Sequence, residues 1–266
     1  MSLRSWWTNY RWRFAPWIAG RVAKDKAIRR STAGDEDPQF RAHLTQELLS
    51  LCGELHRALP VSRTSERRID RDEFSRAQEA LRGTLGFGLG RSASTVKDCG
   101  EGVFVSDGAV RKDQLTAIYP GTVYFAGEPA LLVSLNNSFI FRCADGCLID
   151  GNDRRLSKFI YRSCCYRDRR GPFLTADMTW LTDRPANPLA IGQYVNNESA
   201  ENPANVRYVE LELETKSVHP TLRRFVPNVR YQSLSADSVL RLVVLVARRD
   251  VSVGEELFSS YFTIVE

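Results

Sequence analysis

The chain has 266 residues and a mass of 30.1 kDa, and its 43% hydrophobic and 26% charged residues are typical of a folded globular protein. No apolar run approaches the roughly 20 residues of a membrane-spanning helix, so the sequence predicts no transmembrane segment. The net charge of +5 is concentrated at the N-terminus: residues 1–98 hold 18 Lys and Arg against 12 Asp and Glu, while residues 99–266 hold 19 against 20.

Residues 1–24 contain four Trp and five Lys or Arg, and no acidic residue precedes Asp25. Large apolar side chains recur there at roughly helical spacing, with an interruption at Pro16: Trp6, Tyr10, Phe14, Trp17 and Ile18. Three interpretations fit this pattern: an organelle transit peptide, a helix docked on the edge of the core, or an anchor on a membrane surface or on nucleic acid.

A first helix is predicted to follow. Asp37 and Pro38 suit an N-cap and a first helical position, and Pro60 ends the segment. The apolar residues between them lie on one helical face: Phe40, Leu44, Leu48, Leu51, Leu55 and Leu59. This pattern predicts a helix that packs by its leucines.

A second, shorter helix is predicted from a capping box. Asp70 and Glu73 have the required spacing, and the helix is expected to run to about Leu81 and to be closed by Gly83. The glycines of GFGLG at 86–90 follow a helix and not a strand, unlike those of a dinucleotide-binding loop. We therefore interpret them as a linker.

From residue 99 the sequence changes character, because short β-branched and aromatic runs alternate with Gly, Pro and Asn. The runs predicted as strands are 103–105, 117–119, 139–141, 148–150, 206–213 and 242–246. Residues 99–266 are thus predicted as a β-rich domain, preceded by a helical, basic accessory region over residues 1–98, which gives an α+β fold. The Arg-rich stretch at about 152–187 is predicted as an insertion with a function or a structure of its own.

Six cysteines stand in a sequence without an apolar signal-peptide core, which favours reduced thiols in an intracellular compartment. Cys143 and Cys147 have a spacing that some metal sites use, with Cys164 and Cys165 as candidate partners. Adjacent cysteines rarely face one ion and no histidine is near them, so we predict spectator thiols and no metal.

Four further segments carry residues suited to binding or chemistry. CGEGVFV at 99–105 places two glycines before a strand, where another group could approach the backbone closely. TAIYPG at 116–121 ends a strand in Tyr-Pro-Gly, and GEELFSSY at 254–261 ends another in an aromatic residue. YVNNESAENPAN at 194–205 contains four asparagines between two apolar runs.

In this order, the segments resemble the SET domain of protein lysine methyltransferases. GEG, YPG, LID at 148–150, YVNNESAENPAN and GEELFSSY are similar to the GxG, YxG, IDA-type, RFxNHSCxPN and GEELxxDY motifs of that family. YPGTVY, FIFRC, LIDGND, GQYVNN and YFTIVE narrow the resemblance to one vertebrate group of SET-domain proteins. It implies a SET fold in which the Asn-rich segment and the C-terminal strand cross in a pseudoknot.

The resemblance also implies a function. The family transfers methyl groups from S-adenosylmethionine to lysine amines, so the partner would be a protein substrate with an accessible lysine. Matched positions assign cofactor contacts to Gly100, Glu101, Gly102, Asn196, Asn197 and Tyr261. Tyr261 also matches the catalytic tyrosine of the family, Tyr119 matches the tyrosine beside its lysine channel, and Asn205 would brace the pseudoknot.

Departures from the motifs keep a second class of function open. Asn197 stands where the family has His, Glu198 and Ser199 replace Ser-Cys, and Ser260 replaces Asp. No Cys-rich segment follows the last motif to close the lysine channel, which leaves the Arg-rich insertion as a candidate for that role.

The alternative is a SET-fold binding module of weak activity. It would use the basic N-terminus and the Arg-rich insertion to hold a protein partner or nucleic acid. The nucleus and the mitochondrion both agree with the sequence as locations, and the sequence leaves the oligomeric state open.

Overall fold

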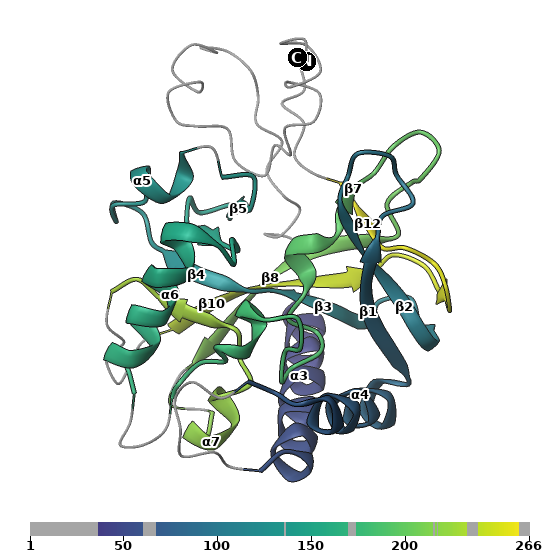
Figure 1. The fold of residues 1–266 in the computed structure, drawn as a ribbon, viewed down its shortest axis with the longest axis horizontal. Coiled ribbons are helices and arrows are strands. Elements are labelled where there is room, and N and C mark those ends of the chain that lie inside the picture. The colour runs from purple at the N-terminus through teal and green to yellow at the C-terminus, as the bar shows by residue number, and fades with distance from the viewer. Residues whose placement is uncertain are drawn as a thin grey trace.

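The computed structural model describes residues 37–60, 68–135, 137–169, 174–214, 216, 218–232 and 239–260. Its fold is α+β, with a helix pair packed against three small sheets (Figure 1). The aromatic N-terminal segment and Tyr261 lie outside the described residues. Within the described ranges, no helix combines the length and the hydropathy of a membrane span.

The first helix, α3 (Pro38–Ala58), lies where the sequence predicts it. The Asp37 side chain accepts a hydrogen bond of 3.0 Å from the Gln39 amide, which satisfies one backbone donor of the first turn. The buried face of α3 consists of Leu44, Leu48, Leu51, Cys52 and Leu55. These side chains belong to the same apolar core as the strands, so the helix contributes directly to the core of the β-rich region.

The second helix, α4 (Arg71–Leu85), begins at the predicted capping box, whose two reciprocal hydrogen bonds join Asp70 and Glu73. The predicted end at Gly83 is wrong, because Gly86 caps the helix with a φ of 84°. The buried face continues past Gly83 with the spacing of Ala77, Leu81 and Leu85. Burial of the last leucine offsets the cost of about 1 kcal/mol that a glycine imposes inside a helix.

The linker predicted at 86–90 is also wrong. Residues 87–90 belong to β1 (Phe87–Ala93), which pairs with β2 (Glu101–Val110). β2 in turn pairs with β11 (Val251–Ser252). Phe87 and Leu89 are buried, so apolar residues alternate at the period of a strand despite the intervening glycines. β-Structure therefore begins before residue 99.

The second sheet has the order β3-β10-β8-β12-β7. Its strands are β3 (Leu115–Tyr119), β7 (Asn196–Asn197), β8 (Val206–Glu214), β10 (Val239–Ala247) and β12 (Phe258–Ser259). The last strand, β12, lies between β7 and β8 and runs parallel to both (Figure 1). The Asn-rich segment connects those two flanking strands, so the C-terminal strand crosses it as the SET resemblance implies.

The third sheet has the order β5-β6-β4-β9, and each of the six predicted runs overlaps a strand of the structure. Its strands are β4 (Gly121–Tyr124), β5 (Ile140–Arg142), β6 (Leu148–Asp150) and β9 (Asn228–Arg230). The Arg-rich insertion contains α6 (Arg155–Arg167) and the 3-10 helix η2 (Thr179–Leu181). The remaining short helices are α5 (Leu131–Ser134), α7 (Pro220–Arg223) and the 3-10 helix η3 (Gly192–Tyr194).

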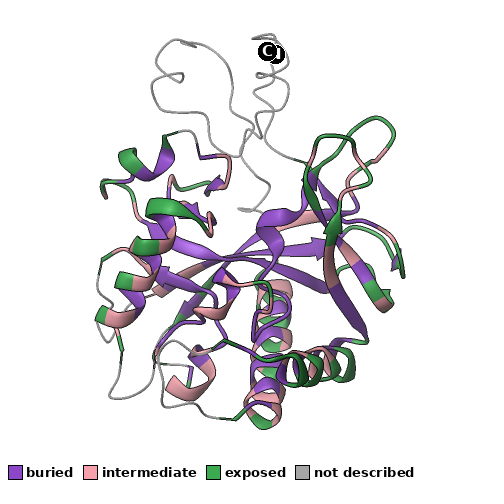
Figure 2. Ribbon diagram, viewed as in Figure 1, coloured by how far each residue is buried: buried purple, intermediate pink, exposed green. Residues whose placement is uncertain are grey.

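Burial follows these layers (Figure 2). The strands of the second sheet are buried over most of their length, and α3 and α4 turn their apolar faces toward the sheets. The insertion supplies most of a second, smaller apolar cluster, which includes Tyr161, Cys164, Cys165 and Trp180 and is completed by Ala190 and Val229 from outside it. The prediction that the insertion carries structure is therefore confirmed.

We expect the stability of the fold to depend on pH through Asp177, a buried residue that lies in the chain between Ala176 and Met178 of this second cluster. Burial raises the pKa of Asp177 to about 6, so the folded state holds its proton at a higher pH than the unfolded chain does. The protonated Asp177 therefore makes its full contribution to the free energy of unfolding at low pH. As the pH rises from about 4 to about 6, the free energy of unfolding falls by up to about 3 kcal/mol. Urea unfolding at a series of pH values should show this loss.

Asp177→Asn is the matched variant. In this variant the free energy of unfolding should fall less steeply with pH than in the wild type. The fall that remains is expected from Asp150, because burial also raises the pKa of Asp150 to about 6. An equally steep decline in wild type and variant would show that Asp177 does not titrate in this window.

Candidate functional site

Those predicted cofactor residues that the structure describes, which exclude Tyr261, lie where the start of β2 meets β7 and β12. The Asn196 side chain is 1% exposed. Its Nδ2 donates to the backbone oxygen of Glu101 at 3.2 Å and to Glu256 Oε1 at 2.9 Å. Sequence segments almost a hundred residues apart are thus joined by one amide, as the matched motifs imply.

Glu256 lies at the centre of this site, although the sequence analysis did not single it out. Its carboxylate is buried and accepts hydrogen bonds from Ser94 Oγ at 2.8 Å, from the Thr95 amide at 2.8 Å and from Thr95 Oγ1 at 2.5 Å. Together with Asn196 Nδ2, four donors surround the Glu256 carboxylate. The carboxylate therefore holds in place both the Asn196 side chain and the loop before the GEG segment. In an extended chain successive side chains point to opposite faces, so Glu256 shares a face with Phe258 while Glu255 points the other way. This alternation could have identified Glu256 from the sequence as the buried one of the two acids.

The GEG segment needs glycine at position 102 because of the same carboxylate. A Cβ atom on Gly102 would lie 2.1 Å from Glu256 Oε1. At Gly100, by contrast, a Cβ would meet nothing within 4 Å, so space is open beside the backbone. The group that approaches Gly102 closely is therefore a side chain of the protein, and the open backbone lies at Gly100.

These residues fit S-adenosylmethionine. Open space beside Gly100 lets a ligand come close to the chain there, while the Gly100 oxygen itself accepts from the Ser94 amide at 2.8 Å. The Asn196 amide is held in place next to this segment by Glu101 and Glu256. Amides donate and accept hydrogen bonds without a net charge, which suits a ligand that carries an ammonium, a carboxylate and a sulfonium.

Two of the departures from the family motifs contact each other. Ser260 Oγ donates to Glu198 Oε1, and this hydrogen bond lowers the pKa of Glu198. The Glu198 amide also donates to the Ser259 oxygen at 3.0 Å. Glu198 replaces the serine of the first family motif, and Ser260 replaces the aspartate of the second. The acid and the hydroxyl have thus exchanged positions, and the two replacements form one hydrogen-bonded pair. Asn197, beside them, is exposed and lies in register with Ser259.

Asn205 braces the crossing, as the resemblance implies. Its side chain is buried, Nδ2 donates to the Glu256 oxygen at 2.8 Å, and Oδ1 accepts from the Phe258 amide at 2.8 Å. Its own amide donates to the Phe258 oxygen at 3.0 Å. Three hydrogen bonds thus hold the C-terminal strand against the Asn-rich segment.

The predicted channel tyrosine, Tyr119, is buried in a cluster of aromatic rings. Its hydroxyl donates to the Phe139 oxygen at 2.8 Å. Its ring centroid lies 5.4 Å from that of Phe141 and 6.4 Å from that of Tyr208. The structure therefore places the Tyr119 hydroxyl against the backbone of Phe139, and its catalytic role stays a prediction.

Tyr208 is the aromatic residue of this cluster that reaches the end of β12. Ser259 Oγ donates to the Tyr208 hydroxyl at 2.9 Å. Ser259 precedes Ser260, and the predicted catalytic residue Tyr261 follows directly in the chain. The sequence analysis missed Tyr208; its place near the start of the strand after the Asn-rich segment was the available signal.

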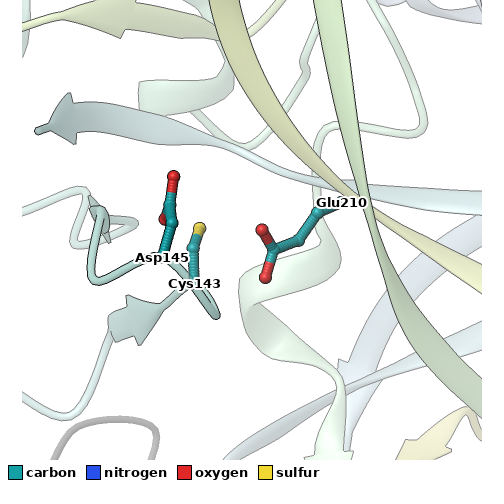
Figure 3. Close-up of side chains that lie close together, drawn as sticks. All are labelled: Cys143, Asp145 and Glu210. Atoms are coloured by element: carbon teal, nitrogen blue, oxygen red, sulfur yellow. The ribbon is translucent and has the colours of Figure 1, made fainter. Parts of the chain in front are cut away.

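A separate group of side chains has the spacing of metal ligands. One ligand atom each of Cys143, Asp145 and Glu210 lie within 4.8 Å of one another (Figure 3). Burial, followed by the charge of Glu210, raises the pKa of the Cys143 thiol well above its usual value. Burial therefore opposes formation of the thiolate that a metal would bind, so a metal would have to displace this proton.

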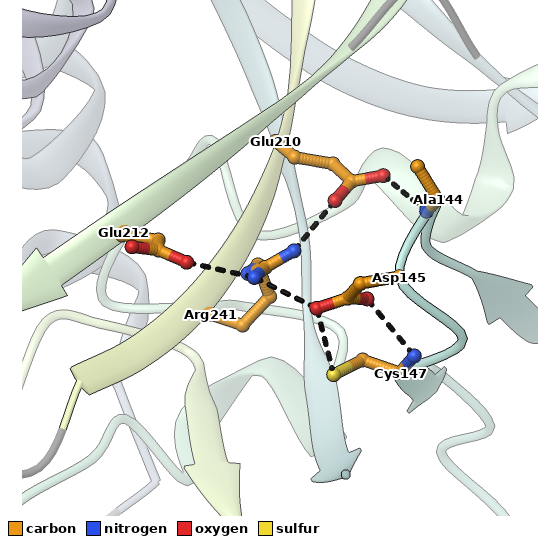
Figure 4. A network of polar contacts seen from close by, with 6 residues as sticks. All are labelled: Ala144, Asp145, Cys147, Glu210, Glu212 and Arg241. Carbon is orange, nitrogen blue, oxygen red and sulfur yellow. Dashed lines mark hydrogen bonds and ion pairs between the residues drawn. The ribbon is translucent and has the colours of Figure 1, made fainter. Parts of the chain in front are cut away.

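Arg241 already supplies positive charge to this group (Figure 4). Its guanidinium lies 2.6 Å from Glu210, 2.9 Å from Asp145 and 2.7 Å from Glu212. The network ties the turn between β5 and β6 to β8 and β10, and we interpret it as structural. Cys164 and Cys165, the other candidate ligands, belong to the apolar cluster of the insertion.

Comparison with known proteins gives two close relatives. The chain is 42% identical over 294 aligned residues to human SET domain-containing protein 9, which covers 97% of this chain and 96% of the relative. It is 49% identical over 201 residues to the protein of the same name from Pongo abelii, covering 75% of this chain and 72% of the relative. This is the group to which the sequence segments narrow the resemblance.

Other comparisons add little. No family model matches the chain. A solved SET8 protein from Cryptosporidium is 15% identical and covers 84% of this chain and 95% of its own, with a TM-score of 0.35, which is too low to carry an argument.

Proposed function

Since the chain belongs to the family of SET domain-containing protein 9, within the SET-domain methyltransferases, we propose that it transfers a methyl group from S-adenosylmethionine to a lysine amine of a protein substrate. One observation supports this proposal above the others. The buried Asn196 amide joins the GEG segment to Glu256, and open space lies beside Gly100 of the same segment.

The cofactor-binding role falls on five described positions of this chain. The backbone of Gly100, Glu101 and Gly102 and the side chain of Asn196 would hold S-adenosylmethionine, together with the backbone of Asn197. When bound, the cofactor supplies a methyl group activated by its sulfonium. Neutral amides hold such a ligand without neutralising that positive charge.

The lysine substrate must lose its proton, because a free lysine has a pKa of about 10.4 and only the neutral amine has a lone pair to donate. An apolar channel lowers that pKa by desolvation. The rings of Tyr119, Phe141 and Tyr208 form an aromatic cluster beside the crossing and would exclude water there. The Tyr208 hydroxyl, held by Ser259, and Tyr261 would orient the amine, since alignment supplies much of the rate acceleration in such transfers.

The test uses S-adenosylmethionine with a radioactive methyl group, cell lysate as substrate, and the wild-type and Tyr261→Phe proteins. We expect both proteins to bind the cofactor in calorimetry and only the wild type to label a protein band. Lysate whose lysines have been chemically acetylated should give no band, because an amide nitrogen has no available lone pair to accept the methyl group. Binding without labelling would favour the binding module, and absence of cofactor binding would overturn the assignment of Gly100, Gly102 and Asn196.

A further inference from the structure

Exposed apolar side chains are concentrated in one part of the molecule. Within the described ranges, six large apolar side chains are exposed, and five of them lie on or beside α5 and α6. Their exposed fractions run from 46% to 71%: Leu131, Leu132, Leu135, Leu156 and Phe159. The sixth, Val253, lies in the turn after β11. Folded proteins rarely leave such side chains grouped on the surface without a binding role.

The two helices present these side chains on neighbouring surfaces. Val133 of α5 is buried with Ala130 and Tyr124, and Ile160 of α6 packs against the same small cluster. In Figures 1 and 2, α5 accordingly lies beside the N-terminal end of α6, with exposed residues on both. Each helix therefore buries one face and leaves a second apolar face uncovered. We call the five exposed side chains the α5–α6 patch.

Positive charge borders the patch. Arg154 and Arg155 directly precede Leu156, and both are exposed. Arg154 lies 3.5 Å from Asp153, while the structure records no ion pair for Arg155 with any described residue. Neither α5 nor α6 contains an acidic residue.

The start of α6 is an unfavourable place for these arginines. Arg154 is the N-cap and makes no capping hydrogen bond with its side chain, and the first turn lacks an acid. The helix dipole is positive there and repels a cation. Arg155 also has a φ of 51°, in the left-handed region that a non-glycine residue adopts at a cost. An acidic group from outside would relieve the repulsion.

We infer that the α5–α6 patch docks a segment of a partner protein that combines acidic with apolar side chains, such as one face of an acidic amphipathic helix. The apolar side chains would cover the leucines and Phe159, and the carboxylates would pair with Arg154 and Arg155. This inference stands apart from the proposed methyl transfer, because it rests on residues outside the cofactor site.

Other occupants fit the charges less well. Residues 1–24 are aromatic, but they contain five Lys or Arg and no acid, so they would bring like charge to the arginines. A second copy of the chain in a two-fold dimer would face arginines with arginines. Nucleic acid would pair with the arginines and leave the leucines in water.

The experiment measures binding of three fluorescent peptides to the full chain by anisotropy. The first peptide is amphipathic, with Leu and Phe on one helical face and Glu on the other. The second replaces Glu by Lys, and the third replaces Leu and Phe by Ser. We expect the first to bind at least about tenfold more tightly than either of the others, and to weaken as NaCl rises from about 50 to about 300 mM.

Variants locate the binding. Leu132→Asp combined with Phe159→Asp, and separately Arg154→Ser combined with Arg155→Ser, should each weaken the first peptide about tenfold. Val253→Asp is the matched control and should bind as the wild type does, and circular dichroism checks that all variants fold. Equal binding of the Lys peptide, equal binding by the patch variants, or a preference for phosphatidylserine vesicles or duplex DNA would overturn the inference.

Discussion

Glu256→Gln is expected to weaken S-adenosylmethionine binding about tenfold to a hundredfold. The buried carboxylate accepts hydrogen bonds from Ser94, Thr95 and Asn196. An amide of the same shape turns one acceptor oxygen into a donor, which then faces other donors. Each unsatisfied buried donor costs about 1–3 kcal/mol. Part of this cost is expected to weaken cofactor binding, because the Asn196 side chain is no longer held in its binding position. Calorimetry with S-adenosylmethionine measures the change.

Glu255→Gln provides the control for this prediction. Its side chain pairs with Arg249 on the surface at 2.7 Å, and an exposed pair contributes about 1 kcal/mol or less. Cofactor binding by this variant should therefore equal that of the wild type. Thermal unfolding of both variants separates positioning from stability. If the Glu256 variant binds the cofactor normally, or loses binding only in proportion to its loss of folded protein, the carboxylate does not position Asn196.

Features governed by neighbouring residues could be predicted from the sequence. The Asp37 cap and the box formed by Asp70 and Glu73 depend on residues at most three positions apart. The strands were recognisable because short β-branched and aromatic runs stand between Gly, Pro and Asn residues. Where a local signal misled, a buried face decided the outcome: Leu85 extends α4 past Gly83, and Phe87 with Leu89 makes a strand of a glycine-rich stretch.

The site depends on contacts that no local pattern encodes. Ser94 and Glu256 are 162 residues apart, and Glu198 and Ser260 are 62 residues apart. Motif matching treated Glu198 and Ser260 as two separate departures, whereas the fold joins them in one hydrogen bond. The motif also located Tyr119 but not the direction of its hydroxyl, which donates to the Phe139 oxygen while the ring packs against both Phe141 and Tyr208.

Arg241→Met is expected to destabilise the fold by about 3–5 kcal/mol, the usual cost of leaving a buried charge without its partner. The Arg241 side chain is 12% exposed and that of Glu210 is 9% exposed, so solvent screens this pair weakly. Without the guanidinium, the Ala144 amide at 2.7 Å is the remaining recorded donor to Glu210 within the part of the chain that the structure describes. Urea unfolding monitored by circular dichroism measures the loss.

Two further variants show whether the unpaired charge or the lost packing causes this effect. Glu212 is 60% exposed, so Glu212→Gln should cost about 1 kcal/mol or less. Adding Glu210→Gln to Arg241→Met removes the buried charge and should recover much of the stability, because well-packed neutral groups often replace a buried ion pair at little cost. A double variant no more stable than Arg241→Met would assign the effect to packing. If Arg241→Met costs no more than Glu212→Gln, the network does not hold the β5–β6 turn against β8 and β10.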